Sequence, residues 1–328
     1  MRRPIQHFAG IALMCAAWAC PVTVVASETK LAVIIFQGVQ NLPLLAAQAQ
    51  GFFGQRHLSI DLRIAGSSEE MRDGLARGHY QIAHGAVDNA VAMVESTHLD
   101  IAVIIGGDNG FNHLFVQPCI KSYQDLSGKT VIVDAPDTAY AFQLYAILKQ
   151  HGVSVAEYEV RPVGASSKRL EAMLQDRSLM ASMLNLPFTV RAQRAGLRDM
   201  GAAIDLLGPY QGTAGFVLRS WARANSDLLV SYIQAYIDGL RFVLDQSNKP
   251  AAIKMLMDEL NLPVDVASQS YETALDPEQG LARDAKFDLE GFENVLRLRA
   301  EFRHFGESLP PPQKYLDLSF YQRALAGL

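Results

Sequence analysis

The sequence predicts an α/β fold of two lobes, with a double crossover hinge between them and a helical C-terminal extension. From residue 31 onward, short apolar runs alternate with amphipathic segments, which is typical of parallel sheets covered by helices. The alternation restarts after a turn-rich break at 106–112, and beyond about Leu229 helical patterns follow one another. A chain of 328 residues is also large for one core, so two lobes are expected.

Residues 1–26 have the pattern of an export signal. Two arginines precede an apolar stretch at 8–18, and Val24 and Ala26 occupy positions −3 and −1 of a small-residue cleavage site. The apolar stretch is too short to span a bilayer, and the bulky residue before Ala19-Cys20 makes a poor lipidation motif. We expect cleavage after Ala26 and a soluble protein in the periplasm.

Removal of the signal changes the composition of the chain. Of 3 cysteines only Cys119 remains, so no internal disulfide can form. Loss of the two signal arginines leaves 27 basic against 34 acidic residues, a net charge of −7. This acidic balance, without any basic run, argues against nucleic acid as a partner. No later segment is apolar for long enough to cross a membrane. We also expect the protein to be a monomer.

Three strand–helix units are predicted at the start of the mature chain. The run at 31–36 is almost wholly apolar, as in a strand covered on both faces. Ser67 and Glu70 have capping-box spacing at a helix start. The predicted strands are 31–36, 60–64 and 81–85, and the predicted helices are 43–51, 68–78 and a third beginning near Asp88.

The second half of the pattern predicts the other lobe and the helical extension. Ser226 is expected to cap a long amphipathic helix that ends before Pro250. We expect residues 27–111 and 212–328 to form one lobe and 112–211 the other. The predicted strands are 101–105, 113–117, 130–133, 159–163 and 179–184, with helices at 137–150 and 166–174.

Several segments, in their order and spacing, resemble one family of solute-binding proteins. The clearest is Asp125-Leu-Ser-Gly-Lys-Thr-Val-Ile-Val133, which is similar to a signature at the start of that family's second lobe. The family is the type-2 periplasmic binding proteins of ABC importers for nitrate, sulfonates, taurine and thiamine-precursor pyrimidines. The other matching segments are LPLLAAQAQGFFG at 42–54, DGLARGHYQIA at 73–83, RLEAML at 169–174 and RAGLR at 194–198.

The resemblance implies a receptor that closes about a hinge when it binds a small solute. Its partners would be an ABC permease and the cytoplasmic ATPase of that permease. Two alternatives stay open: a periplasmic ligand-sensing subunit for a signalling receptor, and an exported enzyme on the same scaffold. The sequence has no G-x-S-x-G, H-E-x-x-H, P-loop or C-x-x-C motif, and its 8 histidines lack metal-ligand spacing. We therefore expect no enzyme activity, no catalytic residue, no metal and no cofactor.

Polar residues gather where the predicted strands of the first lobe end. Ligands of open parallel sheets bind at the carboxyl ends of strands, near helix N-termini, so these residues are candidate contacts. Each has a structural alternative: a polar turn after the first strand, capping at Ser67 and Asp88, and a hydrogen-bonded core side chain at His84. The candidates are Gln37, Gly38, Gln40, Asn41, Ser67, His84, Asp88 and Asn89.

In the second lobe the loop at 134–140 stands where the resembling family carries a Ser/Gly/Thr-rich, anion-holding loop. Thr138 matches that arrangement, whereas Asp134 and Asp137 depart from it. Because carboxylates repel an anion in a desolvated cleft, we expect an organic solute, aromatic or heterocyclic, rather than a bare inorganic anion. The candidates in this lobe are Asp137, Thr138, Tyr140, Asn185 and Phe188, of which Phe188 has a core alternative.

Overall fold

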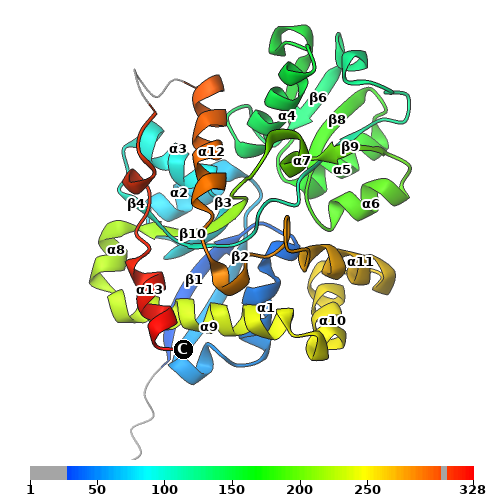
Figure 1. The fold of residues 1–328 in the computed structure, drawn as a ribbon. Helices are drawn as coiled ribbons and strands as arrows, with labels where there is room; N and C mark the ends of the chain where they lie inside the picture. The colour runs from blue at the N-terminus through cyan, green and yellow to red at the C-terminus, as the bar shows by residue number, and fades with distance from the viewer. Residues whose placement is uncertain (1–27, 304–308) are drawn as a thin grey trace, which may run out of the picture.

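The computed structural model describes residues 28–303 and 309–328, so the predicted export signal lies outside the described residues. Two five-stranded sheets form the centres of two lobes (Figure 1). The strands of the first sheet are β1 (Thr29–Ile35), β2 (Leu58–Ile64), β3 (Ile82–Ala86), β4 (Ile101–Gly106) and β10 (Thr213–Leu218). Those of the second are β5 (His113–Val116), β6 (Thr130–Val133), β7 (Glu159–Pro162), β8 (Leu179–Leu184) and β9 (Arg198–Ala202).

Each sheet is mixed, whereas the strand–helix alternation predicted parallel sheets. The strand orders are β2-β1-β3-β10-β4 and β7-β6-β8-β5-β9. In the first sheet β10 runs antiparallel to β3 and β4, and in the second β5 runs antiparallel to β8 and β9. Both reversed strands follow a crossover from the other lobe rather than a helix packed on their own sheet. The βαβ argument for parallel pairing therefore does not apply to them.

Helices cover the sheets because their apolar faces need burial against a partner. In the first lobe these include α1 (Leu42–Ala49), α2 (Ser68–Ala76), α3 (Asp88–Thr97) and α8 (Arg219–Ala224). The second lobe contains α4 (Ala139–Gln150), α5 (Ser166–Gln175), α6 (Phe188–Arg194) and α7 (Ala203–Leu207). The strands predicted at 130–133 and 179–184 have the predicted bounds.

The two crossovers join β4 to β5 and α7 to β10, and hydrogen bonds hold them side by side. Gly212 donates its backbone N–H to the carbonyl oxygen of Asp108 at 2.9 Å. The Asp108 carboxylate accepts from the backbone N–H of Gly110 at 2.8 Å and from the Thr213 hydroxyl. Burial raises the pKa of Asp108 to about 6. The hinge region is therefore organised around one buried carboxyl group.

The C-terminal part is helical, as predicted. It consists of α9 (Ser226–Leu244), α10 (Lys249–Leu260), α11 (Val264–Ala274), α12 (Leu289–Phe302) and α13 (Ser319–Ala326). Helix α9 packs along α1 under the first sheet (Figure 1). The prediction that Ser226 caps α9 is wrong, because Asn225 precedes the first turn and no side chain caps it. No described helix is both long and apolar enough to cross a membrane.

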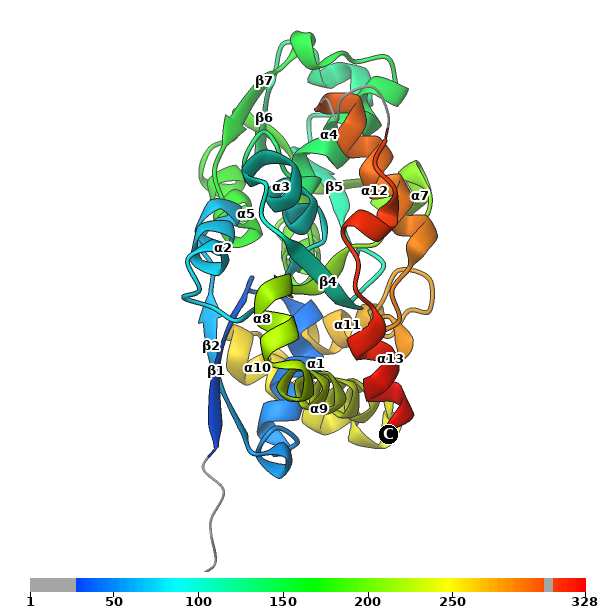
Figure 2. The ribbon, with the colours of Figure 1, turned by 90° about the vertical axis from the view of Figure 1, so that its left-hand side faces the viewer.

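Helix α12 reaches from the first lobe to the second and lies beside α4 (Figure 2). Phe302 stacks on Phe142 with ring centroids 6.0 Å apart, and Lys149 Nζ lies 2.6 Å from Glu301 Oε1. Earlier in α12, the Asn294 amide donates to the carbonyl oxygen of Leu207 at 2.9 Å. The helix thus supplies a third connection between the lobes, which nothing in the sequence pattern predicted.

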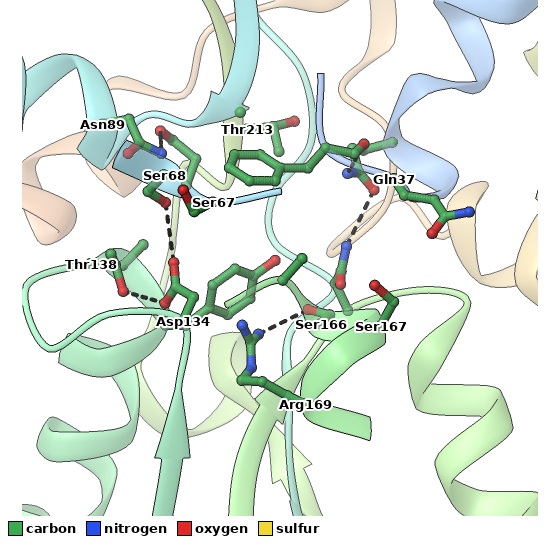
Figure 3. A pocket seen from close by; sticks show the side chains of 18 residues that line it. Gln37, Ser67, Ser68, Asn89, Asp134, Thr138, Ser166, Ser167, Arg169 and Thr213 are labelled. Atoms are coloured by element: carbon green, nitrogen blue, oxygen red, sulfur yellow. Dashed lines mark hydrogen bonds between the residues drawn. The ribbon is translucent and has the colours of Figure 1, made fainter. Parts of the chain in front are cut away.

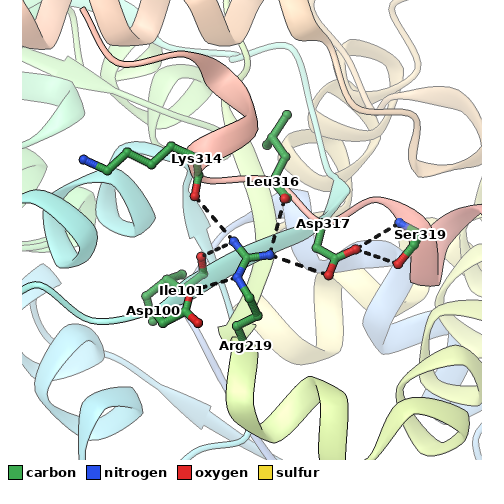
Figure 4. Close-up of polar contacts among 7 residues, drawn as sticks. All are labelled: Asp100, Ile101, Arg219, Lys314, Leu316, Asp317 and Ser319. Carbon is green, nitrogen blue, oxygen red and sulfur yellow. Dashed lines mark hydrogen bonds and ion pairs between the residues drawn. The ribbon is translucent and has the colours of Figure 1, made fainter.

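The C-terminal segment also covers the edge strand β4. Its backbone pairs with Val103 on both sides, since Val103 donates to Tyr315 at 2.8 Å and accepts from Asp317 at 2.9 Å. Arg219 joins the segment to the start of β4, since it contacts Asp317 of the segment at 3.5 Å and Asp100, just before β4, at 2.8 Å (Figure 4). An open strand edge is a template for aggregation, so this cover protects the first sheet.

Candidate functional site

A cavity lies between the two lobes at the strand ends, with an empty volume of about 590 Å³ that includes space open to solvent (Figure 3). Helix N-termini from both lobes open onto it: α2 and α3 from the first, α4 and α5 from the second. The lining residues are Phe36, Gln37, Gln40, Ser67, Ser68, Gly85, Ala86, Asn89, Asp134, Thr138, Ala139, Tyr140, Ala165, Ser166, Ser167, Arg169, Asn185 and Thr213.

Polar contacts cross between the lobes at the cavity. The Ser68 hydroxyl of α2 donates to Asp134 Oδ2 at 3.1 Å. Asn185, just after β8, donates through Nδ2 to Gln40 Oε1 at 3.4 Å. Hydroxyl and amide groups on facing lobes are thus already within hydrogen-bond reach. A solute enclosed here would be contacted from both lobes at once.

Asp134 is a carboxylate held by hydroxyl groups. It follows β6 directly and accepts from Ser68 of the first lobe and from Thr138 at the start of α4. Thr138 also contacts the carbonyl oxygen of Ala135 at 3.0 Å. Its hydroxyl hydrogen can serve only one acceptor at a time, and the carboxylate is the stronger one. Thr138 therefore orients the Asp134 side chain within the cavity (Figure 3).

Arg169 of α5 is the basic residue of the lining, and it is 0% exposed. Its guanidinium donates to Ser182 at 3.0 Å, to Ser166 at 2.9 Å, to the carbonyl oxygen of Met183 at 3.0 Å and to that of Gly164. Among the described residues, these four bonds leave one of its five N–H groups without an acceptor. The guanidinium carbon also lies 4.7 Å from the centre of the Tyr140 ring. Arg169 is thus fixed in place and supports the Tyr140 wall.

Two lining side chains have unusual local environments. Burial raises the pKa of Tyr140 to about 12, so its hydroxyl stays protonated and can donate. Asn185 is 6% exposed, and its Oδ1 has no hydrogen-bond partner among the described residues. A buried acceptor without a partner is costly, so Asn185 Oδ1 calls for a donor from a bound molecule or water.

A smaller space, with an empty volume of about 300 Å³ that includes space open to solvent, continues from the cavity toward the crossovers. Both spaces share Gln40, Tyr140, Asn185 and Thr213. The smaller space adds the buried carboxyl group of Asp108. Its other new lining residues are Phe111, Asn112, Tyr210 and Gly212. The cavity thus extends to the hinge region itself.

The family comparison agrees with this architecture. A family model described as NMT1/THI5 like matches residues 39–249, more than half of the chain. This chain belongs to the NMT1/THI5-like family. The family predicted from the sequence segments is therefore confirmed. Among curated proteins, none matches the sequence.

Solved structures share the fold of this NMT1/THI5-like chain at low identity. The ligand-binding component of an ABC-type import system from Staphylococcus aureus, with zinc bound, has a TM-score of 0.76 at 12% identity, covering 90% of this chain and 99% of its own. The nitrate-binding protein NrtA from Synechocystis PCC 6803 has a TM-score of 0.75 at 12% identity, and the match covers 92% of this chain and 89% of NrtA. The alkanesulfonate-binding protein SsuA from Xanthomonas axonopodis pv. citri, bound to MOPS, has a TM-score of 0.68 at 14% identity, and the match covers 89% of this chain and 97% of SsuA. These likenesses confirm the predicted two-lobed fold.

Seven of the expected contact residues line the cavity of the NMT1/THI5-like protein. They come from five separate strand ends, which the fold brings to one cleft. Within residues 28–303 and 309–328, no three His, Cys, Asp or Glu side chains gather as a possible metal site. The seven are Gln37, Gln40, Ser67, Asn89, Thr138, Tyr140 and Asn185.

Two of the other expected contacts lie outside the cavity because the core takes up their side chains. His84 Nε2 lies 2.9 Å from the Tyr232 hydroxyl, and its ring stacks on Tyr236 with centroids 5.2 Å apart. Burial lowers the pKa of His84 to about 3, so the ring is neutral. Phe188 is buried in the apolar core around α6. For both residues the core alternative holds.

Asp88 and Asp137 are also corrected by the structure. Both Asp88 carboxylate oxygens accept from Arg299 Nη1, at 2.8 and 2.9 Å, and both side chains are buried. The same Nη1 lies 3.3 Å from the backbone carbonyl oxygen of Asp137. Asp88 is not the cap of α3 either, since Val87 holds that position without a side-chain bond. These two acidic residues therefore belong to the junction with α12.

Gly38 and Asn41 shape the turn after β1 rather than the cavity wall. The Asn41 amide donates to the carbonyl oxygens of Phe36 at 2.5 Å and of Gly38 at 3.2 Å. At Gly38 a Cβ atom would lie 2.1 Å from the Gln40 side chain. Both residues therefore hold Phe36 and Gln40 in position. The expected polar turn is what the structure shows.

Sequence reasoning missed several lining residues, chiefly Arg169, Ser166, Ser167 and Thr213. Arg169 precedes Leu170 in a helix whose apolar residues mark a buried face, and it lies in the segment 169–174 that resembles the family. A charged residue next to that face was the available signal. Ser166 and Ser167 open α5 after a strand, which is the position that identified Ser67 and Thr138 as candidates.

Proposed function

We propose that this chain is an extracytoplasmic solute-binding receptor that encloses a small organic solute between its lobes and delivers it to an ABC permease and the ATPase of that permease. The observation that carries the proposal is the inter-lobe cavity, with polar groups of both lobes in hydrogen-bond reach across it. Two structural relatives are named for the solutes they bind, nitrate and alkanesulfonate, which supports the same class of role here.

Solute capture in this proposal is a movement of two bodies about the paired crossovers. One lobe comprises residues 27–111 and 212–328, and the other comprises 112–211. A solute that contacts both lobes favours the closed arrangement, because its differential affinity for that arrangement shifts the equilibrium. The permease would then distinguish the closed receptor from the open one. The protein acts as a periplasmic monomer after cleavage behind Ala26.

The proposed contacts use both kinds of hydrogen-bonding group. Hydroxyl groups at the starts of α2 and α4 and amides after β1 and β8 can donate or accept. The aromatic walls, Phe36 and Tyr140, suit the apolar body of an organic molecule. The proposed contacts are Gln37, Gln40, Ser67, Asn89, Thr138, Tyr140 and Asn185.

Thermal unfolding of purified residues 27–328 tests this function against a panel of amines, organic acids, sulfonates, pyrimidines and inorganic anions. A solute at 100 times its Kd adds about 2.7 kcal/mol to the free energy of unfolding, which raises Tm by about 4 °C for a chain of this size. The expected result is stabilisation confined to one chemical class. Tm values that no solute class raises would contradict the receptor function.

The proposal includes no covalent step. The solute should be released from the protein without chemical change. The NMR spectrum of the solute should therefore be identical before and after prolonged incubation with the protein. Progressive appearance of a product would favour the exported-enzyme alternative instead.

A further inference from the structure

We propose that the solute of this receptor carries a positively charged nitrogen group, an organic ammonium, amidinium or guanidinium, and that Asp134 selects it. This inference rests on the proposed receptor function and narrows its solute class.

The first observation is the partner set of Asp134. Its carboxylate lies in the cavity wall and accepts from the hydroxyls of Ser68 and Thr138. Within the described part of the chain, no ion pair joins it to a basic side chain. An ionised carboxylate offers about four acceptor positions, so two hydroxyl donors leave capacity for more. Asp134 is half-buried, and the charge of Arg169 acts on it without a direct ion pair, so its remaining acceptor positions are open to the N–H groups of a cationic solute.

The second observation is that the cavity's own cation is already engaged. Arg169 donates four hydrogen bonds to protein acceptors and packs against the Tyr140 ring. A bidentate grip on a carboxylate or sulfonate needs two parallel N–H donors, and Arg169 has one left. Any anion here would also face Asp134. Arg169 therefore serves the cavity wall and does not hold an anionic head group.

The third observation is that further acceptors lie elsewhere in the cavity wall. Asn185 Oδ1 is buried, lines the cavity and has no partner among the described residues. The adjoining smaller space adds the Asp108 carboxyl group, whose own hydrogen bonds come from Gly110 and Thr213. A nitrogen group with several N–H donors fits these acceptors. The apolar side chains of Phe36 and Ala139 remain for its carbon skeleton.

The test compares solutes that share a skeleton and differ in charge. Phenethylamine, 2-phenylethanol and phenylacetate form one such set, and butylamine, butylguanidine, butanol and butyrate form another. Each is added to purified residues 27–328 within a wider panel of organic amines, amidines and guanidines with their neutral and anionic counterparts. The expected result is that the cationic members raise Tm and that their neutral and anionic counterparts do not.

Two variants then assign the selection to one residue. Asp134→Asn keeps the size of the side chain and an acceptor oxygen for Ser68 but removes the charge. It should raise the Kd of the cationic solute that stabilises the protein most by at least about 30-fold, as measured by titration calorimetry. Asp137→Asn is the matched control, because it makes the same charge change three residues away and outside the cavity lining. Its Kd should stay within about twofold of the parent value.

Three results would overturn the inference. Unchanged cation affinity in Asp134→Asn would remove Asp134 from the selection. Stabilisation only by neutral or anionic solutes would refute the cationic class and leave the receptor function standing. Stabilisation by no solute of any class would overturn both.

Discussion

Asp88 and Asp134 occupy similar places in the two lobes, yet their surroundings differ. Asp88 begins α3 just beyond β3, and Asp134 follows β6 just before α4. Asp88 is 2% exposed and paired with Arg299 of α12, whereas Asp134 is only half-buried and is contacted by two hydroxyls. The position at a strand end is shared, so the source of the partner decides the role. A carboxylate in a direct ion pair with the protein is structural, and one without such a pair keeps acceptor positions for a solute.

The largest expected effect lies at the structural carboxylate. Arg299→Ala leaves Asp88 buried without its cation, so the free energy of unfolding should fall by about 3–5 kcal/mol. Burial already raises the pKa of Asp88 against the opposing charge of Arg299. Chemical denaturation at pH 7 measures the change. Arg297→Ala, on the exposed side of the same helix, is the control and should change it little. A loss below about 1 kcal/mol for Arg299→Ala would break the contrast with Asp134.

The next effect concerns binding rather than stability. Asn185→Ala removes from the cavity the acceptor that has no partner. It should raise the Kd of the solute identified by thermal unfolding by about 5- to 150-fold. Asn225→Ala is a control outside the cavity lining, where the amide donates to the carbonyl oxygen of Trp221 at 2.9 Å. Titration calorimetry distinguishes them. Equal affinities in the two variants would place the binding site away from Asn185.

The buried ring of His84 should make the free energy of unfolding depend on pH. Its pKa is about 3 in the folded protein and about 6.5 when exposed, so between these values the unfolded chain binds the proton more tightly. The free energy of unfolding should therefore fall as pH is lowered through that window, by up to about 1.4 kcal/mol per unit from this group. His84→Gln lacks this contribution. Denaturation at pH 4, 5, 6 and 7 should show a shallower slope for the variant, and parallel slopes would contradict the buried neutral ring.

The smallest expected effect is the stability change of Asp134→Asn. An amide oxygen can still accept from Ser68, and no direct ion pair is broken, so the change should stay within about 1 kcal/mol. Chemical denaturation without solute measures it. A loss as large as that of Arg299→Ala would make Asp134 a structural carboxylate like Asp88.

Local patterns predicted the strands and the lobes because both depend on residues close together in sequence. The apolar runs at 130–133 and 179–184 mark buried strands with their observed bounds. The antiparallel courses of β5 and β10 were not predictable in this way, because they depend on where the chain crosses between lobes. The bridging course of α12 was missed for the same reason: its contacts with α4 join residues about 150 positions apart.

The residues of the candidate site also differ in how far local sequence predicts them. Strand ends and helix starts identified Ser67, Thr138 and Asn185 as cavity residues from local sequence alone. The partners that withdraw His84 and Asp88 from the cavity, Tyr232 and Arg299, lie 148 and 211 positions away. No local pattern could show that these side chains were already paired.

The most direct test is a crystal structure of residues 27–328 with the solute that raises Tm most. The account predicts electron density for that solute between the lobes, with one end at Asp134 and another within hydrogen-bond distance of Asn185 Oδ1. Density outside this cavity, with Asp134 and Asn185 unchanged, would contradict it.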